Sequence, residues 1–306
     1  MKQTQTTSTV LMVQPVQFGY NQQAAQSNSF MHAPTQSPNQ VQQLALQEFN
    51  TLVEALQQAG VSVHVIPDTT EPATPDSIFP NNWFSTHRTS GQSALVLYPM
   101  ESDSRRLERR DDVQQFLQST FQYQECISLT HYEDIGSYLE GTGSMVLDRA
   151  SNIAYVALSS RSQLQPLQEF CTRLGFTAIT FHSQHPSGVE VYHTNVIMSV
   201  GRNIAVVCFE VIPRHEQDAI RQSLQSTGHT ILELTLEQLN NFAGNMLNLA
   251  SPTGENIWVM SSSAWNSLTP IQQQTLTEDG IIIHSPIPTI EHIGGGSVRC
   301  MIAEVF

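Results

Sequence analysis

The stretch GSMVLDRASNIAYVALSS, residues 143–160, has the pattern of a β-hairpin: an apolar run, a turn rich in Ser and Asn, and a second apolar run. The sequence RSQLQPLQEFCTRLG follows at residues 161–175, and its apolar side chains recur every three or four positions, which predicts a helix with one buried face. The run TAITFH at residues 177–182 predicts a third strand. Together these segments predict one β-β-α-β unit.

The same layout occurs three more times along the chain. The other hairpin patterns are NNWFSTHRTSGQSALVLYP, TNVIMSVGRNIAVVCFE and GNMLNLASPTGENIWVMSS, at residues 81–99, 194–210 and 244–262. Helical patterns follow them at residues 105–121, 213–228 and 269–280. Strand patterns come next, at residues 125–130, 230–235 and 281–286. The chain therefore repeats with a period of about 50 to 60 residues.

A fifth copy is split between the two ends of the chain. It consists of a strand at residues 10–15, a helix at 40–60, a strand at 61–67 and a closing apolar run at 297–306. Five such units predict an α/β fold, a five-bladed pseudo-symmetric ββαβ propeller. We expect one domain over residues 10–306 and a flexible N-terminus at residues 1–9. Two unrelated α/β domains would leave the shared layout unexplained.

The charge of the chain argues against several kinds of partner. Asp and Glu number 27 against 13 Lys and Arg, so the net charge is -14, which disfavours binding to nucleic acid or to acidic membranes. The N-terminus lacks the apolar stretch of a secretory signal, so we expect a cytoplasmic protein. The four cysteines form no CxxC pair, which argues against a zinc site. Both a monomer and an oligomer are compatible with the sequence.

Polar residues recur at the start of each unit, where a ring would bring them to a common centre. They are Asp76 and Asn82 in PDSIFPNNW, Glu140 in YLEGTGSMV, His193 and Asn195 in VYHTNVIM, Asn245 in AGNMLNL, and Cys300 in VRCMIAEVF. We expect His193 and Asn195 to lie on a strand and face the same way. The glycines after Glu140 would let the backbone approach a ligand.

These residue types suit nucleophilic catalysis. A thiol is a weak nucleophile until a neighbouring group favours its thiolate, and His193 could do this for Cys300 and then act as general acid and base. Glu140 could orient the imidazole or bind substrate nitrogen. Asn82 and Asn195 suit a planar, polar, uncharged group. Asp76 fits a turn as well as it fits substrate binding.

Other candidate residues have simpler interpretations. We expect Cys126, Cys171 and Cys208 to be buried filler, and RRLERR at residues 105–110 to be a solvated helix start. For the carboxylate of an amino-acid substrate, the sequence does not choose among Arg88, Arg202 and Arg299. Arg299 would point away from Cys300 if both lie in a regular strand.

The motifs PDSIFPNNW, EGTGSMVLDR, HTNVIMSVGR, GNMLNL and GGGSVRCM resemble those of the guanidino-group-modifying, or pentein, superfamily over essentially the whole chain. This superfamily includes arginine deiminase, dimethylarginine dimethylaminohydrolase, agmatine deiminase, amidinotransferases and citrulline-cleaving relatives. The resemblance implies a five-bladed propeller in which Cys300 attacks a guanidinium or ureido carbon. It also implies that His193 is the general acid and base, that Glu140 binds substrate nitrogen, and that no metal or organic cofactor takes part.

Two positions depart from arginine deiminases. Asn82 and Asn195 stand where those enzymes carry aspartates, which hold a guanidinium cation through charge-assisted hydrogen bonds. Each such bond contributes roughly 1.5 to 3 kcal/mol, so their loss favours a neutral ureido group. The N-terminal stretch containing residues 18–30 is most similar to the citrulline-hydrolysing branch, and we expect it to form a loop near the cavity mouth.

The resemblance therefore predicts a cysteine-dependent hydrolase that acts on a small amino-acid substrate and converts citrulline to ornithine, ammonia and carbon dioxide. Because Asp76 retains a carboxylate, an arginine or arginine-derivative deiminase or dihydrolase is the first alternative. An amidinotransferase is the next. Outside enzymes, the same fold serves as a non-catalytic binding module, and the presence of Glu140, His193 and Cys300 together argues against that alternative.

Overall fold

The computed structural model describes residues 3–89 and 91–306, and these form five three-stranded sheets. In each sheet the middle strand pairs antiparallel with one neighbour and parallel with the other, as a β-β-α-β unit requires. We call the five units blades 1 to 5 in chain order. The predicted α/β fold of five ββαβ units is confirmed.

The first three blades contain the predicted segments in the predicted order, with the helix of blade 2 divided in two. Blade 1 consists of β15 (Ala303–Glu304), β1 (Thr9–Gln14), α1 (Pro38–Gln58) and β2 (Ser62–Pro67). Blade 2 consists of β3 (Phe84–Arg88), β4 (Ser93–Leu97), α2 (Asp103–Arg106), α3 (Asp111–Phe121) and β5 (Glu125–Ser128). Blade 3 consists of β6 (Val146–Asp148), β7 (Ile153–Leu158), α5 (Leu164–Leu174) and β8 (Thr177–His182).

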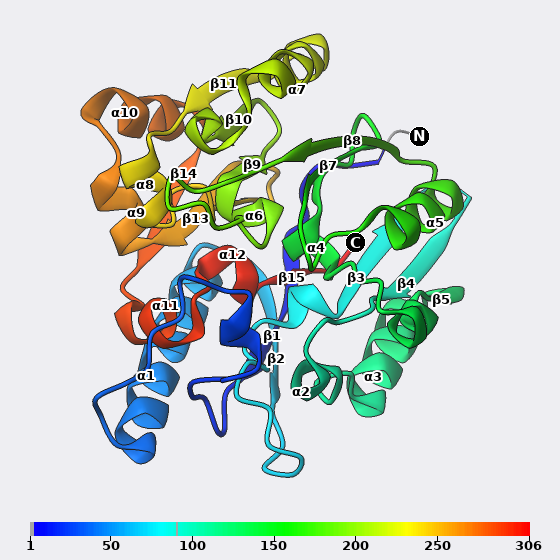
Figure 1. Cartoon of the computed structure of the whole chain (residues 1–306), viewed down its shortest axis with the longest axis vertical. Coiled ribbons are helices and arrows are strands. Elements are labelled where there is room, and N and C mark those ends of the chain that lie inside the picture. Colours follow the sequence, from blue (N-terminus) through cyan, green and yellow to red (C-terminus); the bar gives the residue numbers. More distant parts are fainter. Residues whose placement is uncertain (1–2, 90) are drawn as a thin grey trace.

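The last two blades repeat this order. Blade 4 consists of β9 (Met198–Val200), β10 (Ile204–Val207), α7 (Arg214–Ser226) and β11 (Thr230–Glu233). Blade 5 consists of β12 (Leu247–Ala250), β13 (Asn256–Ser261), α9 (Ser262–Ser267), α10 (Pro270–Asp279) and β14 (Ile281–Ser285). Figure 1 shows the five blades around a common centre, with α1, α3, α5, α7 and α10 on the outside.

Short helices connect the blades or line the centre. The α-helices are α4 (Gly141–Ser144), α6 (Thr194–Ile197), α8 (Leu236–Asn240), α11 (Pro288–Gly294) and α12 (Val298–Met301). The 3-10 helices are η1 (Ala24–Gln26), η2 (Pro80–Asn82), η3 (Thr130–Ile135) and η4 (Phe209–Val211). Four of them, η2, α4, α6 and α12, begin units of the repeat.

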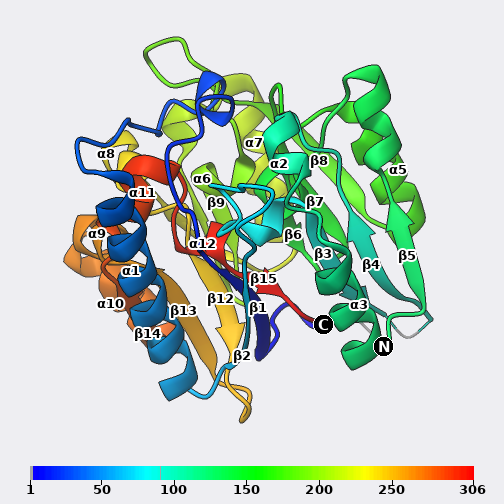
Figure 2. The same ribbon diagram turned by 90° about the horizontal axis from the view of Figure 1, so that it is seen from below.

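Neighbouring blades touch each other all the way round the ring. β15 contacts β3, α4 contacts β3, β6 contacts β9, β9 contacts β12, and α1 contacts β14. In Figure 2 the red C-terminal segment runs beside the blue β1, where β15 pairs with it and completes blade 1. The two ends of the chain therefore close one blade together.

Local signals in the sequence explain where the outer helices begin and end. Ser37 and Thr269 cap α1 and α10 by accepting a hydrogen bond from a backbone N–H in the first turn, and a proline occupies the first turn of both helices. Gly175 ends α5 with a φ of 72°, a left-handed conformation that glycine adopts without strain. These helix ends are therefore set by neighbouring residues in the sequence and do not require contacts between blades.

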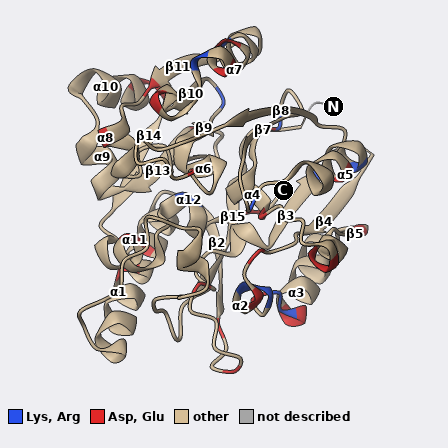
Figure 3. Ribbon diagram, viewed as in Figure 1, with Lys and Arg blue, Asp and Glu red and all other residues tan. Residues whose placement is uncertain are grey.

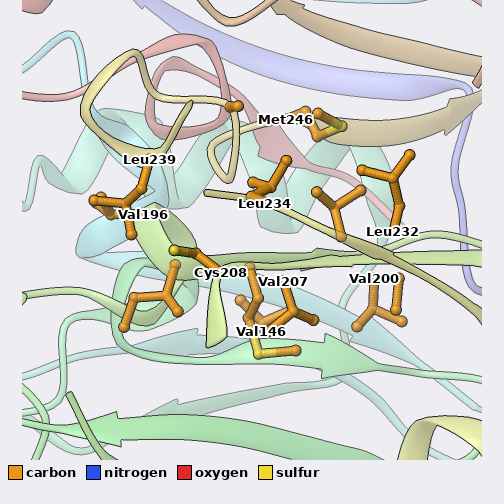
Figure 4. Close-up of a cluster of buried hydrophobic side chains, with 14 of the residues drawn as sticks. Val146, Val196, Val200, Val207, Cys208, Leu232, Leu234, Leu239 and Met246 are labelled. Carbon is orange, nitrogen blue, oxygen red and sulfur yellow. The ribbon is translucent and has the colours of Figure 1, made fainter. Parts of the chain in front are cut away.

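Apolar clusters fill the space between sheets and helices. Figure 4 shows one of them, in which Cys208 lies among valine, leucine and methionine side chains. Cys208 is buried as expected, Cys171 is half-buried and Cys126 is exposed. The prediction that all three are buried filler is therefore wrong for Cys126, which lies on β5 at the edge of blade 2.

Two sequence predictions need correction near the centre. His193 caps α6 and Asn195 lies in its helical turn, so the two residues are not on a strand. Cys300 lies in α12 instead of a strand, and only Ala303–Glu304 pairs with β1. A neighbouring blade contacts the turn of α6: the Thr194 hydroxyl accepts a hydrogen bond from the Ala157 N–H of β7 (2.8 Å).

The charged stretch at residues 105–110 is not a solvated helix start. Arg105 and Glu108 are each only 3% exposed, and α2 ends at Arg106, before α3 begins at Asp111. Figure 3 shows basic and acidic residues side by side on α2 and at the start of α3. The buried ion pair pulls the first turn inward and interrupts the helix that the sequence pattern predicts.

The first described residues contact blades 3 and 4. The predicted boundary at residue 10 stays a prediction: residues 1–2 lie outside the described residues, and the Gln5 amide donates to Leu147 O and Val200 O (both 2.9 Å). Within residues 3–89 and 91–306, no helix has the length and apolar character needed to cross a bilayer.

Candidate active site

The Cys300 thiol lies at the centre of the ring and is held by two amides. Cys300 is 3% exposed and belongs to α12. Its sulfur accepts hydrogen bonds from Asn245 Nδ2 (3.3 Å) and from Asn195 Nδ2 (3.5 Å). Amide donors stabilise a thiolate because they favour the charged form of the group. The predicted nucleophile therefore has two donors from two other blades.

His193 and Glu140 form a buried pair in the same region. His193 Nε2 lies 2.9 Å from Glu140 Oε2, and the two residues are 1% and 0% exposed. Burial lowers the pKa of His193, although Glu140 opposes this effect. Burial alone would raise the pKa of Glu140, but Arg161 and His193 hold it well below its usual range. The carboxylate is thus ionised beside a neutral imidazole at neutral pH.

The glycine pair after Glu140 brings neighbouring blades together. A Cβ on Gly143 would lie 2.6 Å from His193 Nδ1, and the Asn82 amide is also close to that position. Gly141 has a φ of 49°, which disfavours other residues. Gly141 admits the backbone of η2 from blade 2, and Gly143 admits the side chains of Asn82 and His193 from blades 2 and 4.

Asn82 is held in one orientation by a buried ion pair. Arg105 donates to Asn82 Oδ1 (2.8 Å), and its guanidinium also makes two 2.9 Å hydrogen bonds to Glu108. Burial raises the pKa of Glu108 to about 7, although Arg105 opposes this effect. Asn82 Nδ2 is buried without a hydrogen-bond partner among the described residues. The amide therefore presents its N–H groups, and not its oxygen, for a further partner.

Asp76 is a buried acid that lines the same cavity as Asn82 and Cys300. Its Oδ2 accepts a hydrogen bond from Asn21 (2.8 Å) and lies 3.9 Å from Arg105. Burial raises the pKa of Asp76, although Arg105 opposes this effect. Its Oδ1 is buried and has no partner among the residues that the structure describes. Asp76 can therefore accept one further hydrogen bond.

Residues 18–31, which we call the covering loop, close the cavity. Arg161 donates to Ala24 O (2.5 Å) and to Ser27 Oγ (2.9 Å), and Asn28 donates to Gly295 O (3.2 Å). The expected position of this loop near the cavity mouth agrees with the structure. The loop contacts the same arginine that pairs with Glu140 (3.4 Å), so Arg161 connects the loop to this carboxylate.

One narrow cavity brings most of the predicted site residues together. Its lining includes Asp76, Asn82, Arg105, Arg161, Tyr192, His193 and Cys300, together with Ala24, Asn28 and Met31 of the covering loop. Glu140 lies behind His193, and Asn195 lies behind Cys300, on the side away from this lining. The six predicted site residues thus belong to one constellation formed by four blades, and their roles remain proposals.

The three arginines suggested by the sequence are placed elsewhere. Arg88 donates to Phe306 O and Phe121 O at the surface, and Arg202 donates to Gly254 O. Arg299 points away from Cys300, as expected, and pairs with Glu304 (2.9 Å).

Arg105 and Arg161 are the arginines that line the cavity, and sequence reasoning missed them. For Arg161, the available signal was its position just after the predicted second strand of blade 3. Arg105 lies in the charged stretch at residues 105–110, and nothing in that stretch distinguishes it from the neighbouring arginines. Among the described residues, no cluster of three or more His, Cys, Asp or Glu side chains is arranged to hold a metal ion.

Five ββαβ blades around buried Glu, His and Cys side chains define a pentein of the guanidino-modifying superfamily. Within that class, the chain belongs to the family described as eukaryotic N,N-dimethylarginine dimethylhydrolase, whose model matches residues 14–306. A comparison with curated protein sequences finds no match.

Solved structures share the fold at low sequence identity. The arginine dihydrolase ArgZ from the ornithine-ammonia cycle in cyanobacteria has 14% identity and a TM-score of 0.75, over 97% of this chain and 40% of ArgZ. AgrE bound to L-arginine has 16% identity and the same TM-score and coverage. DDAH from Pseudomonas aeruginosa in complex with citrulline has 15% identity and a TM-score of 0.67, over 98% of this chain and 100% of that protein.

The chain thus spans about 40% of full-length ArgZ. It covers 97% of the N-terminal domain of ArgZ, which has been solved with substrate, with product and covalently bound to a reaction intermediate.

Proposed function

We propose that this protein hydrolyses the ureido group of a citrulline-type amino acid through a covalent intermediate on Cys300. The overall reaction converts citrulline and water to ornithine, ammonia and carbon dioxide. The observation that carries the proposal is the fixed orientation of Asn82. Arg105 donates to Asn82 Oδ1, so only the N–H groups of this amide remain for a substrate.

A ureido group matches this donor, whereas a guanidinium does not. The ureido carbonyl oxygen accepts hydrogen bonds, but every nitrogen of a guanidinium cation carries N–H donors and offers no acceptor. A guanidinium placed against Asn82 would therefore leave donors facing donors in a buried cavity, which costs free energy. Asn82 thus selects for a carbonyl oxygen.

The other side chains have complementary roles in this mechanism. The Cys300 thiolate attacks the ureido carbon, and the tetrahedral adduct collapses with loss of one of its two nitrogen groups. His193 takes up the proton that Cys300 loses when it becomes a thiolate, delivers this proton to the leaving nitrogen, and then removes one from the water that hydrolyses the thiocarbamate. The carbamate that forms loses carbon dioxide. Glu140 orients His193 through the 2.9 Å contact at Nε2, which leaves Nδ1 for the reacting groups.

A second candidate is an arginine dihydrolase, and the specific observation in its favour is Asp76. Its unpaired Oδ1 could accept a hydrogen bond from a guanidinium. The same oxygen could accept one from the α-ammonium group of citrulline, so Asp76 does not separate the two substrates. ArgZ is described as an arginine dihydrolase, which agrees with this candidate, and the family description adds a dimethylated arginine.

Product analysis tests the proposal. Purified protein is incubated separately with L-citrulline, L-arginine and N,N-dimethylarginine, and ornithine, citrulline and ammonia are measured by mass spectrometry and an ammonia assay. We expect ornithine from citrulline, none from a Cys300→Ser variant, and full activity from the matched Cys171→Ser variant. Citrulline formed from arginine or dimethylarginine, without turnover of citrulline itself, would overturn the proposal.

An Asn82→Asp variant sharpens the test of selectivity. The new carboxylate would offer acceptors to a guanidinium and repel a carbonyl oxygen, so we expect the ratio of kcat/KM for citrulline to that for arginine to fall. A charge-assisted hydrogen bond contributes more free energy than a neutral one. We therefore expect this ratio of kcat/KM values to change on the order of tenfold or more. An unchanged ratio would show that Asn82 does not select the substrate.

A further inference from the structure

Asn245 contacts the sulfur of Cys300 more closely than Asn195 does. It lies in the segment between α8 and β12, at the start of the repeat in blade 5, and it is completely buried. Its Nδ2 lies 3.3 Å from Cys300 Sγ, compared with 3.5 Å for Asn195 Nδ2. Asn245 does not belong to the lining of the substrate cavity, so substrate binding does not explain this contact.

Two further hydrogen bonds fix the orientation of the Asn245 amide. Its Oδ1 accepts a hydrogen bond from the Arg299 N–H (3.1 Å), and its Nδ2 donates to Asn195 O (2.8 Å). A flipped amide would place oxygen against oxygen at Asn195 and donor against donor at Arg299. The second N–H of Nδ2 is therefore left to donate to the sulfur.

The charged and titratable groups around the thiol make this donor important. On the cavity side lie His193 with Glu140, Tyr192, Asp76, Arg161, and Arg105 with Glu108. On the opposite side, Arg299 and Arg149 share the carboxylate of Glu304, at 2.9 and 3.7 Å. Most of these charged groups pair with a close partner of opposite charge. The groups that hydrogen-bond directly to Cys300 Sγ are the neutral amides of Asn195 and Asn245.

We propose that Asn245 is a further catalytic residue, whose oriented amide donates to the Cys300 thiolate and keeps the nucleophile ionised in a buried site. This inference rests on the proposed function only in taking Cys300 as the nucleophile. A donor to a buried anion favours the ionised form, and its loss returns the sulfur toward the protonated thiol. Blade 5 thereby contributes to the reaction although it supplies none of the Glu, His and Cys set.

The test measures the pH midpoint of Cys300 alkylation by iodoacetamide, resolved by mass spectrometry of the peptide that contains Cys300. The pH midpoint does not depend on how easily iodoacetamide reaches the sulfur. Slower entry of the reagent lowers the alkylation rate by the same factor at every pH and leaves the midpoint unchanged. The variants are Asn245→Asp, which keeps the acceptor for Arg299 and places an oxygen at the sulfur, and Asn245→Ala. The control is Asn248→Asp, because Asn248 also accepts from a backbone N–H and donates to a backbone carbonyl.

We expect both Asn245 variants to raise the midpoint and to slow alkylation below it by about tenfold to a hundredfold, with the larger effect for Asp. The Asn248 control should keep the original midpoint. Circular dichroism identifies any variant that does not fold, and Asn245→Ala decides the question if Asn245→Asp fails to fold. An unchanged midpoint in the folded Asn245 variants would overturn the inference.

The outcome is separable from that of the proposed function. If citrulline is not hydrolysed but the midpoint depends on Asn245, the inference stands and the substrate proposal fails. If citrulline is hydrolysed and the midpoint does not depend on Asn245, the substrate proposal stands and the inference fails.

Discussion

Cys208 and Cys300 are both buried thiols of this protein, but they lie in different surroundings. Cys208 is surrounded by apolar side chains, and burial raises its pKa to about 11. Cys300 accepts hydrogen bonds from Asn195 and Asn245 and shares a cavity with His193. Burial alone makes a thiol inert, and a buried nucleophile requires oriented donors around it. The centre of the ring therefore supplies hydrogen-bond donors to a buried thiol, whereas the apolar cluster around Cys208 does not.

The largest expected effect comes from exchanging each sulfur for oxygen. Cys300→Ser should lower turnover on the order of 10⁴-fold or more, because removal of a nucleophile that acts with its general base removes most of the catalysis. Cys208→Ser should leave kcat unchanged and lower the free energy of unfolding by about 1 to 3 kcal/mol, since it buries a hydroxyl among apolar groups. Steady-state kinetics and urea denaturation measure both. Equal activity of the two variants would remove the distinction between the two regions.

The second effect concerns the carboxylate behind His193. Glu140→Gln should lower kcat by about a hundredfold, because the imidazole loses the charge that orients it and stabilises its protonated form. The matched control is Glu216→Gln on the surface, where Glu216 makes the same type of contact to His182 at 2.8 Å. The control should retain full activity. A similar loss in both variants would indicate a general effect of removing a charge.

A third, smaller effect tests the packing of the polar centre. Gly143→Ala places a methyl group 2.6 Å from His193 Nδ1, so His193 and Asn82 must move. We expect a destabilisation of about 1 to 3 kcal/mol together with a lower kcat. Gly19→Ala is the control, because a Cβ at Gly19 meets no atom within 4 Å. Wild-type kinetics for Gly143→Ala would show that the polar centre tolerates displacement.

The smallest effect is a change in how stability depends on pH. Burial lowers the pKa of His193 from 6.5, so below pH 6.5 the unfolded chain binds a proton that the folded chain does not. Stability should therefore fall as the pH drops from 6.5 toward 5. His193→Gln should reduce that slope by at most about 1.4 kcal/mol per pH unit.

Glu108 and Glu140 have little effect on the difference in pH dependence between the wild-type protein and His193→Gln. Glu108, whose pKa burial raises to about 7, contributes the opposite slope in both proteins and cancels in the difference. The lowered pKa of Glu140 affects stability only below its unfolded value of about 4.5. Denaturant unfolding at several pH values checks the prediction, and identical slopes in both proteins would contradict it.

Local sequence patterns predicted the blades well. The third strand of blade 3 was expected at residues 177–182 and occupies Thr177–His182. In the preceding pattern Leu167, Phe170 and Leu174 face inward in α5, whereas Leu164 is exposed. The patterns failed at the repeat starts, where strand-like runs around His193 and Cys300 form helical turns. Contacts with neighbouring blades decide the backbone there, and those contacts join residues that are far apart in the sequence.

The sequence by itself determined the β-β-α-β repeat, the caps of α1 and α10 and the polar residue at each repeat start, because periodicity, capping and turn formation act over a few neighbouring residues. Only the tertiary structure decided which atoms meet. Arg105 orients Asn82 across 23 positions, Glu140 meets His193 across 53, and Asn245 reaches Cys300 across 55. The physical reason is ring closure, which brings side chains from different blades into one buried volume where each polar group requires a partner.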